Sequence, residues 1–114
     1  MPPTTNFEPG DVVLVAVPFT DQSGTKKRPA VIISSSTYNQ QHPDLIILPI
    51  TSQLRPGMNW DIPMVHWREA GLLKPSTGKP VLATVEKTII VKKLGRLHAE
   101  DLRTLQAGLK KMLI

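Results

Sequence analysis

The chain has 114 residues, and its 14 Lys and Arg against 9 Asp and Glu give a formal net charge of +5 at pH 7. This length predicts one domain, and a hydrophobic content of 40% supplies a core without covalent cross-links. Because there is no cysteine, disulfide frameworks, zinc ribbons and thiol catalysis are excluded. The sequence contains neither a membrane-spanning run nor the pattern of a signal peptide, so we expect a cytoplasmic protein with no membrane contact. The positive charge favours polyanionic or acidic partners.

Residues 1–6 combine prolines with small polar residues, which predicts a flexible tail ahead of a single domain at 7–114. The valine-rich run at 11–17 predicts a buried strand. A polar loop follows at 18–27, and the apolar runs at 30–34 and 45–50 predict two further strands. Three strands in the first half of the chain are typical of a mainly β protein.

The second half is interrupted by prolines and glycines, which leave room only for short strands such as 61–65 before a strand signal returns at 80–91. Only the end has helical periodicity, in one apolar stripe made of Leu102, Leu105, Leu109, Met112 and Leu113. Acidic residues at its start and lysines at its end favour the helix dipole, which predicts a helix from Ala99 or Glu100. We therefore predict a small, bent antiparallel sheet or barrel with a C-terminal helix.

The usual signatures of metal and phosphate sites are missing. His42, His66 and His98 are scattered along the chain without metal-ligand spacing, so we predict no metal site. No nucleophile elbow supports a serine hydrolase, and no glycine-rich loop has the spacing of a phosphate-binding motif. We predict no cofactor.

A basic cluster, Lys26, Lys27 and Arg28, stands at the end of the predicted loop, immediately ahead of the second strand. Short charge runs are typical of solvated loop ends. Alternatively, Arg28, fixed by Pro29 and the strand, presents a rigid guanidinium fork to a phosphate, which a lysine cannot bind in the same bidentate way.

Thr51, Ser52 and Gln53 follow the third predicted strand directly. The simplest interpretation of these polar residues is a turn. The alternative is a set of hydroxyl and amide donors held at a strand end, ready to contact a ligand.

Four segments occur in a specific order: GDVVLVAVPFTDQSGTKKRPAVIIS, ITSQ, AGLLKPS and KTIIVKKLGRLHAEDL. Over about residues 10–113 they resemble the MazF/PemK (also called Kid) toxins of bacterial toxin–antitoxin pairs. The resemblance implies an SH3-like barrel of the CcdB/PemK/MazF type that forms a homodimer. It implies a metal-independent endoribonuclease that cuts single-stranded RNA at short sequences, and a cognate antitoxin whose acidic, flexible tail covers the RNA groove.

By motif match, Arg28 in RPA corresponds to the family's catalytic arginine, and Thr51 in ITSQ to its catalytic or phosphate-binding hydroxyl residue. In the implied reaction a ribose 2′-hydroxyl attacks the adjacent phosphorus and the 5′-oxygen leaves, giving a cyclic phosphate. Arg28 and Thr51 suit the stabilisation of the phosphoryl charge. The group that transfers protons is not identified, because a guanidinium is a poor acid or base at neutral pH and the segment SGTKK lacks the carboxylate that some members carry.

The same comparison predicts further RNA contacts, at Lys26, Lys27, Ser52, Gln53, Lys87 and Thr88. Some family members carry an Arg-Thr pair where this chain has Lys87 and Thr88, and the lysine keeps the charge but loses the fork. Trp60, in a predicted loop, is a candidate to stack on a base, although tryptophans equally fill cores and interfaces.

Two alternatives to RNA cleavage remain at this point. A CcdB-like growth inhibitor keeps the same barrel and binds a protein such as DNA gyrase through its C-terminal helix, which would make LKKMLI decisive and Arg28 dispensable. A degenerate scaffold would only bind antitoxin or RNA, and the intact RPA and ITSQ elements count against it.

Overall fold

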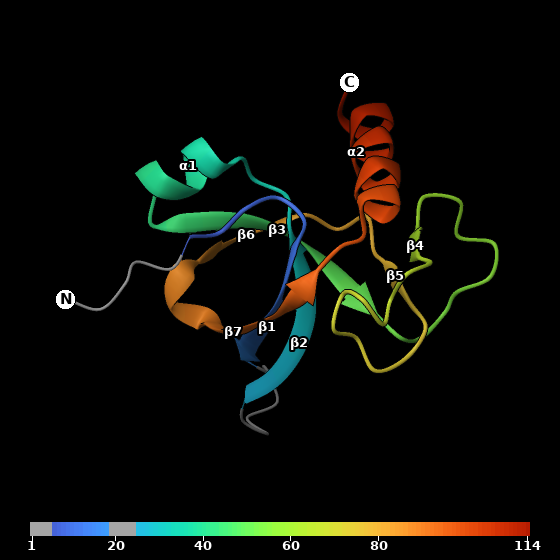
Figure 1. Cartoon of the computed structure of the whole chain (residues 1–114), viewed down its shortest axis with the longest axis horizontal. Coiled ribbons are helices and arrows are strands. Elements are labelled where there is room, and N and C mark those ends of the chain that lie inside the picture. The colour runs from blue at the N-terminus through green and yellow to red at the C-terminus, as the bar shows by residue number, and fades with distance from the viewer. Residues whose placement is uncertain (1–5, 19–24) are drawn as a thin grey trace.

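The computed structural model of the chain describes residues 6–18 and 25–114. Within these ranges it contains seven strands, two α-helices and one 3₁₀ helix, shown in Figure 1. In chain order the elements are β1 (Asp11–Pro18), β2 (Thr25–Ile32), α1 (Ser36–Gln41), β3 (Asp44–Thr51), β4 (Ile62–Met64), β5 (Ser76–Gly78), β6 (Ala83–Glu86), η1 (Lys87–Ile89), β7 (Ile90–Arg96) and α2 (Ala99–Leu113). None of the helices in these ranges is both long and apolar enough to cross a membrane.

The strands form one antiparallel sheet in the order β4-β5-β3-β2-β1-β7, with β6 paired to β3 off this path. The pairing of β1 with β7 shifts register between Val12 and Val13 and again between Leu14 and Val15. Such irregularities bend a strand and increase its twist, which gives β1 and β7 their curvature (Figure 1). The prediction of a mainly β, barrel-like sheet with a C-terminal helix is confirmed, although the path among the described strands stays open.

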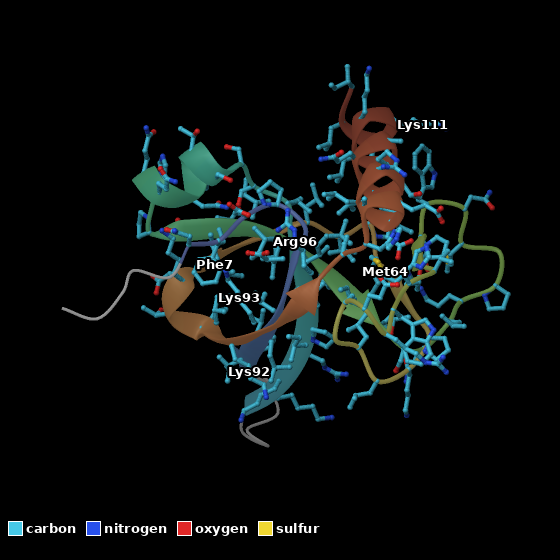
Figure 2. All side chains as sticks on the ribbon, in the orientation of Figure 1. Phe7, Met64, Lys92, Lys93, Arg96 and Lys111 are labelled. Carbon is cyan, nitrogen blue, oxygen red and sulfur yellow. The ribbon has the colours of Figure 1, made fainter. Side chains whose placement is uncertain are left out.

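Buried side chains form two hydrophobic clusters, one on each face of the central strands. Successive strand residues point to opposite faces, so Val12 lies in one cluster and Val13 in the other. The first cluster includes Met64 of β4 and Leu105 of α2, and the second contains Phe7. Figure 2 shows Phe7 inside the curve of the sheet and Met64 beside α2. Burial on both faces explains why the central strands are almost continuously apolar in sequence.

Helix α2 begins at Ala99, as the charge pattern predicts. The Nδ1 atom of His98 accepts a hydrogen bond from the backbone N–H of Glu100 at 3.0 Å and so caps the helix. Asp101, which is 1% exposed, accepts from the backbone N–H groups of residues 65 and 66 at 3.2 and 2.8 Å. These bonds attach the start of α2 to the segment that follows β4.

Several boundaries differ from the predictions. β2 begins at Thr25 rather than at residue 30, because residues 26–28 pair with β1, with Val15 opposite Arg28. The basic cluster therefore lies in a strand and not in a loop. The predicted strand at 80–91 is divided by η1, after which β7 extends to Arg96. The predicted tail at 1–6 lies outside the described residues except for Asn6, and the domain limits stay a prediction.

Helix α1 was not predicted from the sequence, because its six residues STYNQQ carry no apolar stripe. It is defined instead by a local cap, in which the hydroxyl of Ser35 accepts from the backbone N–H of Tyr38 at 3.2 Å. Buried Asn39 donates to the backbone carbonyls of Phe7 at 2.9 Å and Ser34 at 3.0 Å. Polar contacts therefore hold α1 where hydrophobic periodicity gives no signal.

Candidate functional site

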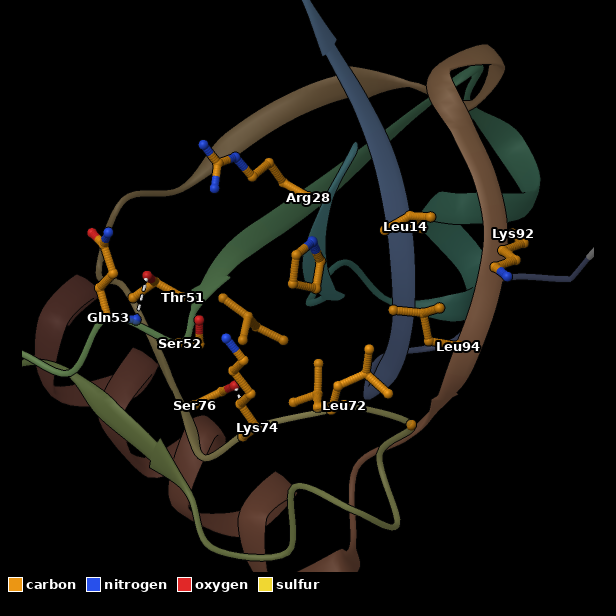
Figure 3. A pocket seen from close by; sticks show the side chains of 14 residues that line it. Leu14, Arg28, Thr51, Ser52, Gln53, Leu72, Lys74, Ser76, Lys92 and Leu94 are labelled. Atoms are coloured by element: carbon orange, nitrogen blue, oxygen red, sulfur yellow. Dashed lines mark hydrogen bonds between the residues drawn. The ribbon is translucent and has the colours of Figure 1, made fainter. Parts of the chain in front are cut away.

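A pocket of about 650 Å³ lies between the end of β3, the central strands and the segment that leads into β5. Its walls come from β1, β2, β3 and β7 and from residues 71–76. In Figure 3, Arg28, Thr51 and Gln53 gather on one side of the pocket, while Lys92 and Leu94 lie on the other. Predicted site residues from two separate motifs thus meet in one place.

Thr51, Ser52 and Gln53 all line this pocket at the end of β3. The Thr51 hydroxyl oxygen accepts a hydrogen bond from the backbone N–H of Gln53 at 3.1 Å. This turn orients the oxygen and leaves the hydroxyl proton free to be donated to a ligand. Because Thr51 also pairs with Thr77 of β5, its backbone is held inside the sheet. The strand end therefore presents a positioned donor.

Arg28 lines the same pocket from β2, and its side chain is exposed. In Figure 3 it extends toward the side of the pocket where Gln53 lies. No described residue forms a hydrogen bond or ion pair with its guanidinium group. Pro29 follows it in the strand and also lines the pocket, and its ring restricts the backbone there. The backbone of Arg28 is thus held in the strand, and no described residue pairs with its guanidinium group.

A further wall is formed by lining residues between Gly71 and Ser76, and Gly71 packs tightly against the backbone of β7. Gly71 has a φ of +82°, and a Cβ there would lie 2.1 Å from the backbone oxygen of Leu94. Only glycine allows this approach without displacing the backbone. At the other end, the Ser76 hydroxyl donates to the backbone oxygen of Lys74 at 2.8 Å. The loop that carries Lys74 is therefore anchored at both ends.

The described lining residues contain three cationic side chains, Arg28, Lys74 and Lys92, and no histidine or carboxylate. Like charges that share a partly enclosed space repel one another, and an anion relieves that repulsion. Leucines 14, 72 and 94 add apolar surface to the same pocket. The pocket therefore suits a ligand that carries both negative charge and apolar faces, as a nucleic acid strand does.

The sequence model for the PemK-like, MazF-like toxins of type II toxin–antitoxin systems matches residues 8–113. The chain belongs to this toxin family. The resemblance carried by the four segments is thereby confirmed, and the toxin is one component of a toxin–antitoxin system. No curated protein sequence matches it.

Solved structures of such toxins share its fold. A MazE–MazF complex from Deinococcus radiodurans superposes with a TM-score of 0.75 at 20% identity, covering 96% of this chain and 97% of that one. The Mycobacterium tuberculosis toxin MazF-mt6 superposes with a TM-score of 0.73 at 20% identity over 89% and 93% of the two chains. A mycobacterial endoribonuclease in complex with its cognate antitoxin has a TM-score of 0.73 at 15% identity over 96% and 95%. At these identities the likeness establishes the fold.

The other predicted RNA contacts of the toxin lie outside the pocket. Lys26 and Lys27 are exposed on β2, directly before Arg28. Trp60 is 54% exposed in the loop between β3 and β4. That loop is held by an ion pair in which Arg55 donates twice to Asp61, at 2.5 and 3.1 Å. Trp60 does not line the pocket, and its predicted stacking on a base stays a prediction.

Lys87 and Thr88 lie in η1 and do not line the pocket. The Lys87 ammonium group donates to the backbone oxygen of Asn39 in α1, and the Thr88 hydroxyl donates to Glu86 at 3.2 Å. Both polar groups therefore have partners within the fold. Their predicted RNA contacts stay a prediction.

The three histidines are far apart in the sequence, but the fold brings two of them together. His66 and His98 stack with ring centroids 3.8 Å apart, because Asp101 holds the segment after β4 against the start of α2. Nε2 of His66 lies 3.3 Å from a Glu100 oxygen, and ligand atoms of His66, Glu69 and His98 come within 4.8 Å of one another. Because Nδ1 of His98 caps α2, this histidine has a structural role at the junction.

Sequence reasoning missed Lys74, Ser76 and Lys92 as lining residues of the toxin pocket. The signal available was weak, because AGLLKPS and KTIIVKK carry the family resemblance without showing which way each side chain points. Lys74 faces the pocket because β5 pairs with the end of β3, and that pairing joins residues far apart in the chain.

Proposed function

We propose that this toxin is a metal-independent endoribonuclease that cuts single-stranded RNA at short sequences and leaves a cyclic phosphate and a 5′-hydroxyl. The observation that carries the proposal is the meeting of Arg28, with no described partner, and the oriented Thr51 hydroxyl in one cationic pocket. The family and the motif matches of RPA and ITSQ support the same assignment.

In the proposed reaction the ribose 2′-oxygen attacks the adjacent phosphorus, and negative charge builds up on the nonbridging oxygens. Arg28 binds two of these oxygens through its guanidinium fork, and the Thr51 hydroxyl donates a hydrogen bond to one of them. Because both residues sit on paired strands, their backbones are fixed before the substrate arrives, and the Gln53 N–H also orients the Thr51 hydroxyl. Ser52 and Gln53 contact the neighbouring nucleotide, and Lys26 and Lys27 attract the incoming strand.

We also propose that a cognate antitoxin with an acidic, flexible segment covers the pocket, and that the toxin forms a homodimer in the cytoplasm. The cationic lining favours an acidic occupant. Two similar toxins were solved with MazE or with a cognate antitoxin, which supports this kind of partner.

The test is cleavage of a mixed-sequence single-stranded RNA in excess EDTA, with analysis of the product ends. We expect discrete fragments with cyclic or 3′-phosphate ends from the wild type. Arg28→Ala should lower the cleavage rate about 100- to 1,000-fold, as removal of one transition-state donor does, and Arg28→Lys should fall between the two because it keeps charge without the fork.

The matched control is Lys110→Ala, which removes one exposed cation from α2, away from the pocket, and should cleave as the wild type does. If a folded wild type arrests growth and cuts no RNA, the proposal fails. Growth arrest that survives Arg28→Ala would likewise contradict it, and a protein target such as DNA gyrase would be examined next.

A further inference from the structure

The proposed reaction releases a 5′-oxygen that needs a proton, and no residue has yet been assigned to supply it. Among the described lining residues the ionisable side chains are Arg28, Lys74 and Lys92. A guanidinium is a weaker acid than an alkylammonium group, so a lysine is the better proton donor of the two types. The inference below rests on the proposed function.

Of the two lysines, Lys74 lies on the side of Thr51. β5 places Thr77 opposite Thr51, and Lys74 stands just ahead of that strand. In Figure 3 the Lys74 side chain points into the pocket toward Thr51 and Ser52, whereas Lys92 lies across the pocket on β7. Lys74 therefore faces the hydroxyl that is proposed to hold the phosphate.

The backbone of Lys74 is held in place. Ser76 donates its hydroxyl proton to the Lys74 carbonyl, and Pro75 restricts the conformation of the residue before it. Gly71 packs against the backbone of Leu94 at the other end of the segment. No described residue binds the ammonium group itself. The backbone of Lys74 is thus fixed, while its ammonium group is available to contact a substrate.

We propose that Lys74 is a catalytic residue that protonates the leaving 5′-oxygen. The 2′-oxygen forms a bond to phosphorus and its proton passes to water, while the bond between phosphorus and the 5′-oxygen breaks. The electron pair of that bond takes a proton from the Lys74 ammonium group and gives the 5′-hydroxyl. The neutral amine then regains a proton from water, so neither a metal ion nor another reagent is consumed. Its exposure lets water reach the amine.

The experiment compares two RNA substrates, one natural and one with sulfur in place of the 5′-oxygen at the cleaved bond. A thiolate is a much weaker base than an alkoxide and leaves without a proton. On natural RNA, Lys74→Ala should be about 100- to 1,000-fold slower than wild type, the usual contribution of a general acid. On the sulfur substrate it should cleave within about threefold of wild type, whereas Arg28→Ala should be slow on both.

Lys74→Arg separates acidity from charge, because arginine keeps the positive charge and is a weaker acid. It should also be slow on natural RNA and recover on the sulfur substrate. Equal losses of Lys74→Ala on both substrates, or no loss on natural RNA, would overturn the inference. Lys110→Ala and thermal unfolding control for general effects. If the wild type cuts neither substrate, the proposed function itself fails.

Discussion

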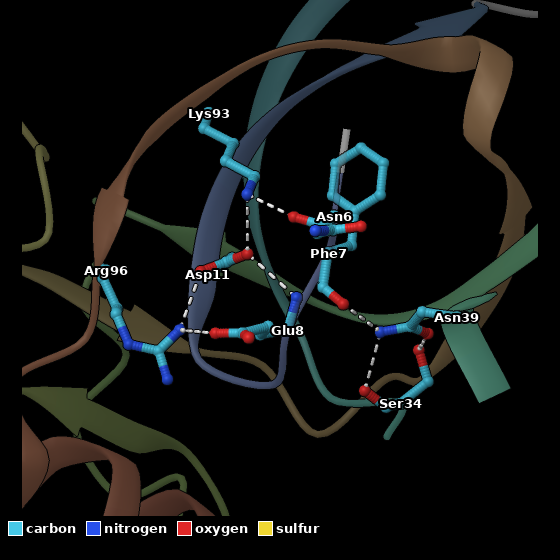
Figure 4. A network of polar contacts seen from close by, with 8 residues as sticks. All are labelled: Asn6, Phe7, Glu8, Asp11, Ser34, Asn39, Lys93 and Arg96. Atoms are coloured by element: carbon cyan, nitrogen blue, oxygen red, sulfur yellow. Dashed lines mark hydrogen bonds and ion pairs between the residues drawn. The ribbon is translucent and has the colours of Figure 1, made fainter. Parts of the chain in front are cut away.

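Lys92 and Lys93 are neighbours on β7 whose charges meet opposite surroundings (Figure 2). The Lys93 ammonium nitrogen lies 3.2 Å from an oxygen of Asp11, and Arg96 donates to the other oxygen of that carboxylate at 2.8 Å (Figure 4). Lys92 instead lines the pocket with Arg28, where no described lining residue is acidic. Because successive side chains of a strand point to opposite faces, one lysine stabilises the fold and the other faces the pocket.

The comparison separates charges that stabilise the fold from charges that are available to a ligand. The Asp11 side chain is 8% exposed, and the backbone N–H of Glu8 also donates to it, at 2.9 Å. Because burial removes water from this carboxylate, its negative charge is stabilised by these donors instead. The pocket cations gain no such partner among the described residues and repel one another, so their benefit appears only when an anion binds.

The largest effect on stability is expected from removing the Asp11 carboxylate, which Lys93 and Arg96 both contact. Asp11→Ala should lower the free energy of unfolding by about 2–3 kcal/mol, because it removes charge-assisted hydrogen bonds and leaves the Glu8 N–H without its acceptor. RNA cleavage per folded molecule should not change. Urea denaturation measures the first quantity, and cleavage assays on folded protein measure the second. A loss below about 0.5 kcal/mol would place this network with ordinary surface ion pairs.

A sharper test exchanges each of the adjacent lysines for methionine and follows the salt dependence of binding to an uncleavable single-stranded RNA. Each phosphate contact contributes about 0.7 to the slope of log affinity against log salt concentration. Lys92→Met should reduce the slope by about that amount and leave stability unchanged. Lys93→Met should leave the slope unchanged and lower stability instead, since its charge is used on Asp11.

If both variants change the slope equally, the distinction between paired and available cations is wrong. If neither does, RNA does not pass the Lys92 side of the pocket. The RNA should carry 2′-O-methyl groups so that the attacking hydroxyl is blocked during the titration.

The elements that the sequence predicted are those with a strong hydrophobic signal. β1 and β3 are apolar on both faces, and α2 has a single stripe with a charge at each end that suits the helix dipole. β5 has only the three residues STG, and η1 interrupts a run that otherwise has the pattern of one strand. Short elements of this kind are defined by their partners, which a single sequence does not display.

The residues of the candidate site also fall into those that local motifs predict and those that they do not. Arg28 and Thr51 follow from motifs, because RPA and ITSQ are local strings that fold onto neighbouring strands. Lys74 requires knowledge of the pairing between β3 and β5, and the stacking of His66 on His98 requires the contact between the segment after β4 and α2. Both depend on long-range contacts rather than on local spacing.

The smallest effect is expected at Lys87. The family resemblance predicts that this lysine binds RNA, but its ammonium group donates a hydrogen bond to the Asn39 carbonyl within the fold. Lys87→Met should lower the free energy of unfolding by about 0.5–1 kcal/mol, the net value of one hydrogen bond, and should leave the salt slope of RNA binding unchanged. Urea denaturation and the titration above measure both quantities, with Lys110→Met as a control that removes an exposed cation of α2. A slope reduced by about 0.7 would show that RNA reaches η1 and that this lysine belongs with Lys92 rather than with Lys93.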